Sequence, residues 1–193
     1  MAIEFELKYR ANPEVLQEIE QAISGQTQTI AMETTYYDTP SGALSGRRYT
    51  LRRRMENDLS VCTLKAPANG LGRGEWELAC ENIEAAVPML CKLGAPADLQ
   101  ALVQEGLIPV CGAKFTRIAK TVPLSDCTVE VALDTGILSG GSKTLPLCEM
   151  EVELKSGSPE ACSAYANQLA IRFGLEPETH SKFRRALALH QGV

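Results

Sequence analysis

Strict alternation between apolar and charged residues is the feature that most restricts how this chain can fold. Near the N-terminus, Glu4, Glu6 and Lys8 alternate with Phe5 and Leu7. Successive side chains of a β-strand point to opposite faces, so this period of two predicts a strand with one apolar and one charged face. The same construction returns along the chain, which predicts a sheet whose charged faces share one side.

Later segments repeat the alternation with complementary charges. Strands separated by turns are expected between residues 34 and 78, and again between residues 113 and 157. Arg53 has the opposite parity to its neighbours and is expected on the outer face. The basic positions of the charged faces are Lys8, Arg52, Arg54, Lys65, Arg73 and Arg117, and the acidic positions are Glu4, Glu6, Glu75, Glu130, Asp134, Glu149, Glu151 and Glu153.

Helical periodicity marks four further segments. Asn12-Pro13 and Ser158-Pro159 each place a capping side chain before a proline at the first helical position. The apolar faces of these helices need the apolar faces of the strands, so the charged faces are expected on the opposite, concave side. This pattern predicts an α+β fold, and the lack of a linker favours a single domain over residues 1–193. The expected helices span residues 13–23, 82–105, 159–173 and 181–190.

The charge types indicate a ligand. Burying many charges without partners is prohibitively costly, so a closed charged interior must hold water, ions or a charged ligand. Arginine and lysine suit phosphate oxygens, and the carboxylates form a hard-oxygen set that suits Mg²⁺ or Mn²⁺. Together they indicate a linear polyphosphate, although a solvated charged face remains the simpler interpretation of any single strand.

Composition excludes several other classes. The net charge of −5 does not indicate general nucleic-acid binding. The seven cysteines form no CxxC pair and the chain has two histidines, so a zinc site and a disulfide framework are not expected. Reduced, buried thiols fit a cytoplasmic protein. No secretion signal and no apolar run of membrane-spanning length is evident.

The ordered motifs resemble the CYTH superfamily, the triphosphate tunnel metalloenzymes. The resemblance implies a closed eight-stranded antiparallel β-barrel, the triphosphate tunnel, flanked by α-helices, as a single CYTH domain over residues 1–193. It also implies Mg²⁺ or Mn²⁺ as cofactor. The motifs are ExExK at 4–8, YYDT at 36–39, LRRR at 51–54, TLK at 63–65, RGEWEL at 73–78, FTR at 115–117, VALDTG at 131–136, EMEVEL at 149–154 and SK at 181–182.

The resemblance assigns roles to individual positions. The catalytic residues would be Glu4, Glu6 and Lys8. The substrate ligands would be Lys8, Arg52, Arg54, Lys65, Arg73, Arg117 and Lys182. The metal ligands would be Glu4, Glu6, Asp134, Glu149 and Glu151. Glu75, Glu130 and Glu153 would line the tunnel in roles that the motifs leave open.

The expected activity is divalent-metal-dependent hydrolysis of inorganic triphosphate to pyrophosphate and phosphate. The expected partner is a small-molecule triphosphate, with no nucleic acid and no membrane. The alternatives are a thiamine or nucleoside triphosphatase, a class IV adenylate cyclase, and a non-catalytic polyphosphate-binding module. The motifs do not separate the triphosphate substrates, and they leave the number of metals and the oligomeric state open.

Several conspicuous residues have plainer interpretations. Tyr36 and Tyr37 are expected to pack rather than to stack on a base, and Trp76 is expected to pack under a helix. His180 is expected at the surface. The cysteines are expected to be small core residues rather than redox switches.

Overall fold

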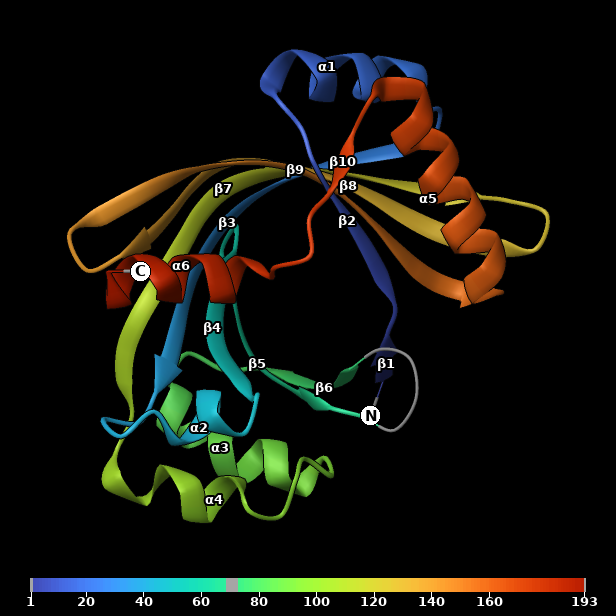
Figure 1. The fold of residues 1–193 in the computed structure, drawn as a ribbon. Coiled ribbons are helices and arrows are strands. Elements are labelled where there is room, and N and C mark those ends of the chain that lie inside the picture. The colour runs from blue at the N-terminus through green and yellow to red at the C-terminus, as the bar shows by residue number, and fades with distance from the viewer. Residues whose placement is uncertain (1, 69–72, 193) are drawn as a thin grey trace.

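The computed structural model describes residues 2–68 and 73–192, and it joins ten strands in one antiparallel sheet (Figure 1). Their spatial order is β1-β6-β5-β4-β3-β7-β8-β9-β2-β10. The strands are β1 (Ala2–Glu4), β2 (Glu6–Arg10), β3 (Gln26–Asp38), β4 (Thr50–Glu56), β5 (Leu59–Pro67), β6 (Arg73–Ala79), β7 (Ile108–Pro123), β8 (Cys127–Gly140), β9 (Lys143–Gly157) and β10 (Glu176–Pro177).

The helices follow the capping signals of the sequence. Asn12 and Ser158 accept hydrogen bonds from the third backbone N–H beyond them, and Gly174 closes α5 in a left-handed conformation with φ of 63°. Among the described residues no helix is long and apolar enough to cross a membrane. The helices are α1 (Pro13–Ala22), α2 (Ala43–Gly46), α3 (Ile83–Lys92), α4 (Leu99–Leu102), the 3₁₀ turn η1 (Val103–Glu105), α5 (Pro159–Phe173) and α6 (Lys182–Gln191).

The sheet is curved, but it is not the closed eight-stranded barrel that the resemblance implies. Phe5 divides the first strand, so that β1 pairs with β6 while β2 pairs with β9. The N-terminal segment thus divides its hydrogen bonds between two strands far apart in the sheet order, and among the described residues no continuous ladder closes the ring. The sheet has ten strands rather than eight because of this division and because of β10, a two-residue strand that pairs with β2.

Strand β3 is longer than the sequence predicts. The expected strand begins at residue 34, whereas β3 begins at Gln26 and pairs with β7 from its first residue. In this part of the strand Ile30 and Met32 face the concave side, and no helix covers the exposed Thr27 and Thr29 on the outside. The first half of β3 therefore has apolar residues inside and polar residues outside, the reverse of the charged-inside pattern. This reversal explains why the alternation did not identify this part of the strand.

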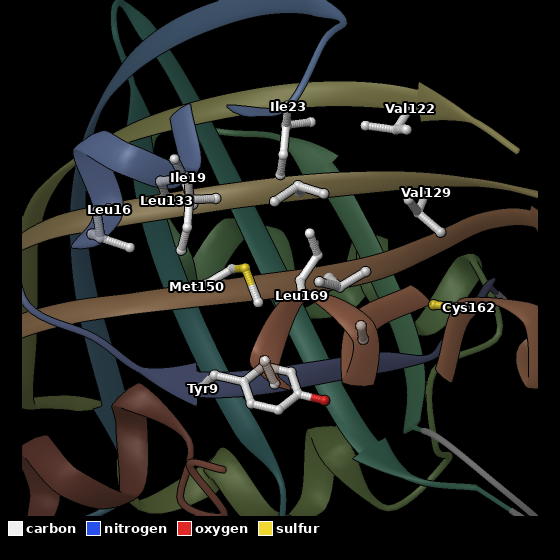
Figure 2. Close-up of a cluster of buried hydrophobic side chains, with 14 of the residues drawn as sticks. Tyr9, Leu16, Ile19, Ile23, Val122, Val129, Leu133, Met150, Cys162 and Leu169 are labelled. Carbon is white, nitrogen blue, oxygen red and sulfur yellow. The ribbon is translucent and has the colours of Figure 1, made fainter. Parts of the chain in front are cut away.

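Two apolar clusters cover the outer side of the sheet. Helices α1 and α5 pack over β2, β7, β8 and β9, with Ile19, Met150 and Leu169 among the buried residues (Figure 2). Helices α3 and α4 pack below β4 to β6 (Figure 1), where Trp76 is buried beside Val87 of α3 as predicted.

The C-terminal helix lies on the inner side of the sheet, unlike the other long helices (Figure 1). It packs through Phe183 and Ala186 against a cluster that includes Tyr36 and Phe115 of the concave face. Close approach to β8 is allowed by Gly140, since a Cβ there would stand 2.3 Å from the carbonyl oxygen of Ala186. Helix α6 therefore occupies one part of the concavity and leaves the remainder as a polar cavity.

Candidate functional site

The concave side encloses a cavity of about 420 Å³, walled by strands β1 to β9 and by the start of α6. Two predicted metal ligands, Asp134 and Glu149, do not line it and are fully buried behind its wall. The predicted site residues that do line it are Glu4, Glu6, Lys8, Arg52, Arg54, Lys65, Arg73, Glu75, Arg117, Glu130, Glu151, Glu153 and Lys182.

The charged lining is balanced. Its carboxylates are Glu4, Glu6, Glu56, Glu75, Glu77, Glu130, Glu151 and Glu153. Its cations are Lys8, Arg52, Arg54, Lys65, Arg73, Arg117, Lys155 and Lys182. With eight charges of each sign, the cavity by itself does not neutralise a polyanion. A polyphosphate ligand would therefore need counter-cations to enter with it.

Strand β4 places Arg52 and Arg54 on the cavity face, opposite Tyr36 and Thr34 of β3. A carboxylate oxygen of Glu75 lies 3.7 Å from the guanidinium of Arg52. The buried Nε of Arg52 has no hydrogen-bond partner within residues 2–68 and 73–192. Burial alone would lower the pKa of Arg52, but Tyr36 and Glu75 outweigh it and raise that pKa. A charged, buried donor without a partner is suited to an anionic ligand.

The neighbouring cations of the β5–β6 wall have protein partners. Lys65 forms an ion pair with Glu4 and lies 3.4 Å from Glu75. Arg73 donates from Nη2 to the carbonyl oxygens of Arg48 at 2.8 Å and of Lys65 at 2.9 Å. The guanidinium of Arg73 thus joins backbone segments at the edge of the cavity as well as lining it.

Lys182 is the centre of a buried ion cluster. Its Nζ lies 2.7 Å from Oδ2 of Asp134 and 2.9 Å from Oε1 of Glu151, and it also forms an ion pair with Glu149. Arg117 donates two hydrogen bonds to Asp134, of 2.8 and 2.7 Å, and a further one to Glu151. The strand register produces this geometry, because Arg117, Asp134 and Glu149 stand side by side on β7, β8 and β9.

The start of α6 supports the same cluster. Ser181 caps the helix by accepting a hydrogen bond from the N–H of Arg184, which places Lys182 at the first helical position. A cation is unfavourable at a helix N-terminus, so the surrounding carboxylates compensate both the ammonium and the helix dipole. One turn later, Arg185 donates to Glu149 and lies 3.6 Å from Glu178.

The cluster perturbs its own protonation. Burial alone would raise the pKa of Glu151, but Lys182 and Arg117 reverse the effect and hold that pKa well below its usual range. Burial raises the pKa of Glu149, and the negative charge of Glu151 adds to this rise. Burial alone would lower the pKa of Lys182, yet the carboxylates around it raise the pKa far above the ordinary lysine value. The ammonium of Lys182 therefore stays charged.

The structure divides the predicted metal ligands into two groups. Asp134, Glu149 and Glu151 offer oxygens that lie within 4.8 Å of one another, a spacing that could hold a metal ion. Their charges, however, are balanced by Lys182, Arg117 and Arg185, and a cation would have to displace the Lys182 ammonium. Glu4 and Glu6 belong to the other group, which lines the cavity directly.

The second carboxylate group includes a residue whose role the motifs left open. Glu6 of β2 stands opposite Glu153 of β9, and Glu4 precedes Glu6 on the same face. Burial raises the pKa of Glu153. The negative charges of Glu4 and Glu130 add to this rise, and Lys155 opposes it. Each carboxylate of this group has a lysine partner, which is Lys65 for Glu4, Lys8 for Glu6 and Lys155 for Glu153. All three carboxylates line the cavity, so this group is open to a divalent ion there, whereas Asp134 and Glu149 of the Lys182 cluster are not.

Sequence reasoning missed several residues of the site. Arg185 follows Lys182 by three positions, and this spacing on one helix face was an available signal. Tyr36 is buried as predicted, but it also lines the cavity, with its ring centroid 5.1 Å from that of Phe183. Glu56 also lines the cavity, where it binds Arg54. Arg53, as predicted, lies outside and donates to the carbonyl oxygen of Glu81.

Comparison with known proteins adds sequence and fold relationships. The CYTH domain matches residues 2–187. An inorganic triphosphatase from Haemophilus influenzae is 29% identical over 197 residues, which cover 98% of this chain and 55% of that protein. The chain thus spans about half the length of this relative.

Solved structures show the same fold at low identity. A Pyrococcus horikoshii OT3 protein superposes with a TM-score of 0.66 at 22% identity, covering 95% of this chain and 98% of its own. The Hippeastrum protein HpAC1, for which a dominant triphosphatase activity is described, gives a TM-score of 0.64 at 19% identity, covering 100% and 96%. At these identities the likeness concerns the fold alone.

Proposed function

Because the chain belongs to the CYTH domain family, we propose that it hydrolyses inorganic triphosphate to pyrophosphate and phosphate with a divalent cation, Mg²⁺ or Mn²⁺. Arg52 carries this proposal, since it lines the cavity together with other cations and its buried Nε lacks a partner among the described residues. The likeness to the Haemophilus influenzae inorganic triphosphatase supports the choice of substrate. Inorganic triphosphate offers anionic oxygens along its whole length and has no organic group that needs a pocket.

Substrate binding is assigned to the cations that face the cavity. Arg52 would donate its guanidinium fork to phosphoryl oxygens, with Lys65 beside it and Lys8 on the opposite wall. Lys182 would contribute its positive charge to the cavity wall from a position held by three carboxylates, which take up its N–H donors. This prior fixation leaves little side-chain entropy to lose when the substrate binds, so the Lys182 charge is preorganised.

The metal ligands are assigned to Glu4, Glu6 and Glu153. Glu4 and Glu6 are kept from the sequence-based assignment and Glu153 is added. Asp134, Glu149 and Glu151 are left out, because all three share the ammonium of Lys182. A divalent cation held there would neutralise phosphoryl oxygens and lower the pKa of a water molecule for in-line attack. The protein contributes position and charge, and no nucleophilic side chain is required.

Phosphate release from inorganic triphosphate tests the proposal. We expect activity with Mg²⁺ or Mn²⁺ that is lost on chelation, and Arg52→Met should lower kcat/KM by about 10- to 100-fold, as expected for a lost charged hydrogen bond. Arg53→Met is a matched control, since it removes the adjacent guanidinium from the outer face. Equal activity of Arg52→Met and wild type would refute the assignment of Arg52.

A substrate panel separates the alternatives. Thiamine triphosphate and ATP are assayed beside triphosphate with each metal, and cyclic AMP is measured in the ATP reactions. Faster hydrolysis of thiamine triphosphate or ATP would replace the proposed substrate, and cyclic AMP formation would indicate a cyclase. Tight triphosphate binding without turnover under either metal would indicate a binding module instead.

A further inference from the structure

Arg54 differs from Arg52 in being hydrogen-bonded to a carboxylate, whereas Glu75 lies 3.7 Å from Arg52. Its Nε donates to Oε1 of Glu56 at 2.7 Å, and its Nη2 donates to the same oxygen. Both side chains line the cavity, where Arg54 is 14% and Glu56 is 26% exposed. The Nε–Nη2 edge of the Arg54 guanidinium, which could bind phosphoryl oxygens, is therefore already occupied by Glu56.

The position of Glu56 is fixed by the turn that follows it. Asn57 adopts a left-handed conformation with φ of 53°, donates its N–H to the carbonyl oxygen of Ala31 at 2.9 Å, and accepts the Ala31 N–H on its side chain at 3.0 Å. This double hydrogen bond ties the end of β4 to β3. The carboxylate consequently lies at a defined place in the cavity wall rather than on a free loop.

The cationic part of the β3–β4 wall ends at this pair. Glu56 stands opposite Met32 in the strand register, and the next β3 residues that line the cavity are Ile30 and Gln28. None of these three carries a charge. An anion extending along β4 would meet first Arg52, then Arg54 with its bound carboxylate, and then uncharged residues of β3. The cavity-lining cation opposite Ile30 is Arg117 of β7, whose guanidinium already binds Asp134 and Glu151.

We propose that Glu56 competes with an additional phosphoryl group for Arg54 and thereby limits the length of the linear phosphate that the cavity accepts. The inference rests on the proposed triphosphatase function and deepens it by assigning chain-length specificity. A triphosphate is bound around Arg52 and leaves the Arg54–Glu56 pair intact. A tetraphosphate places its fourth group at Arg54, where it must displace Glu56 against like-charge repulsion.

The test compares inorganic triphosphate with inorganic tetraphosphate, whose hydrolysis adds one water across a phosphoric anhydride bond and yields triphosphate and phosphate. Glu56→Gln keeps the size of the side chain and removes the charge. We expect the ratio of kcat/KM for tetraphosphate to that for triphosphate to rise about tenfold, since loss of a competing charged contact of this kind is worth about one such factor. Glu33→Gln is the control, because Glu33 forms an exposed ion pair with Lys114 outside the cavity.

The outcomes separate this inference from the proposed function. Absence of triphosphate hydrolysis by the wild type would refute the function, whereas an active wild type with an unchanged ratio in Glu56→Gln would refute the role of Glu56 alone. An equal rise for both substrates would also overturn the inference, as it would mean that Glu56 competes with triphosphate itself. Glu56→Ser removes the same charge with a smaller side chain and gives an independent ratio if Glu56→Gln is unstable.

Discussion

Replacing Lys182 with methionine removes the ammonium around which three buried carboxylates gather. Asp134 and Glu149 are fully buried, and Glu151 is nearly so. Methionine keeps an unbranched side chain of similar length, so the main change is the loss of charge. Arg117 and Arg185 remain in the variant, which leaves three carboxylates facing two guanidinium groups.

The expected loss of stability is large because two of the three remaining carboxylates, Asp134 and Glu149, are fully buried. Removing one partner of a buried ion pair typically costs about 3–5 kcal/mol. For a domain of this size one kcal/mol corresponds to about 2–4 °C in Tm, so the melting temperature should fall by about 6–20 °C. Lys114→Met is the control, since Lys114 is 73% exposed in its pair with Glu33 and should cost no more than about 1 kcal/mol.

The loss should depend on pH with a defined sign. In the wild type the pKa of Glu151 lies below its unfolded value of 4.5, so its contribution is present above that pH and is lost as the pH falls below it. Without Lys182 the largest charge that lowers the pKa of Glu151 is gone, so that pKa rises while Arg117 still opposes the rise. The variant therefore gains less stability than the wild type as the pH increases beyond 4.5. The difference between variant and wild type should consequently be greater at pH 7 than at pH 5.

Urea denaturation of both proteins at pH 5 and pH 7, followed by circular dichroism, measures this difference. The description of the cluster as a charge-balanced group would be refuted if Lys182→Met cost less than about 1 kcal/mol at pH 7 and the variant kept the same pH dependence as the wild type. The measurement requires no substrate and no metal. It therefore tests the electrostatics of the cluster independently of the proposed activity.

Three further predictions concern other parts of the fold. Gly140→Ala should destabilise the protein by about 1–3 kcal/mol, because the new Cβ would stand 2.3 Å from the Ala186 carbonyl oxygen and 2.6 Å from the His190 backbone nitrogen. An unchanged urea midpoint would contradict the close packing of α6 on β8. Cys62 should resist maleimide labelling until the protein unfolds, since burial raises its thiol pKa to about 12. Mass spectrometry follows the labelling, and rapid modification of Cys62 in the native protein would contradict this prediction. Ser158→Ala should cost about 1 kcal/mol in thermal unfolding through loss of the α5 cap, and a cost near zero would show that the cap is dispensable.

The predictability of particular elements follows from how local their causes are. The caps at Asn12 and Ser158 act within one helical turn, so sequence sufficed to place the starts of α1 and α5. The cavity-facing parity of Arg52 depends only on the strand period, and it too was predictable. The first half of β3 was not, because Ile30 and Met32 face inward only where α6 and Phe115 make that part of the concavity apolar.

Partner choice among the charged residues could not be predicted in the same way. Sequence parity places Asp134, Glu149 and Glu153 on one side of the sheet without showing which of them reach the cavity. The register across β7, β8 and β9 and the position of α6 bring Lys182 to Asp134 and Glu149. They leave Glu153 beside Glu6 at the cavity.

By itself the sequence determined the β-rich fold class, the charged face of the strands that alternate strictly, the chemical kinds of group that gather there and the family. These depend on strand periodicity and residue type, which are local. Only the tertiary structure decided that the sheet remains open, that α6 enters the concavity, and that Arg54 is hydrogen-bonded to Glu56 while the Nε of Arg52 has no partner among the residues that the structure describes. Ion pairing depends on distances across strands and on burial, and the folded chain sets both.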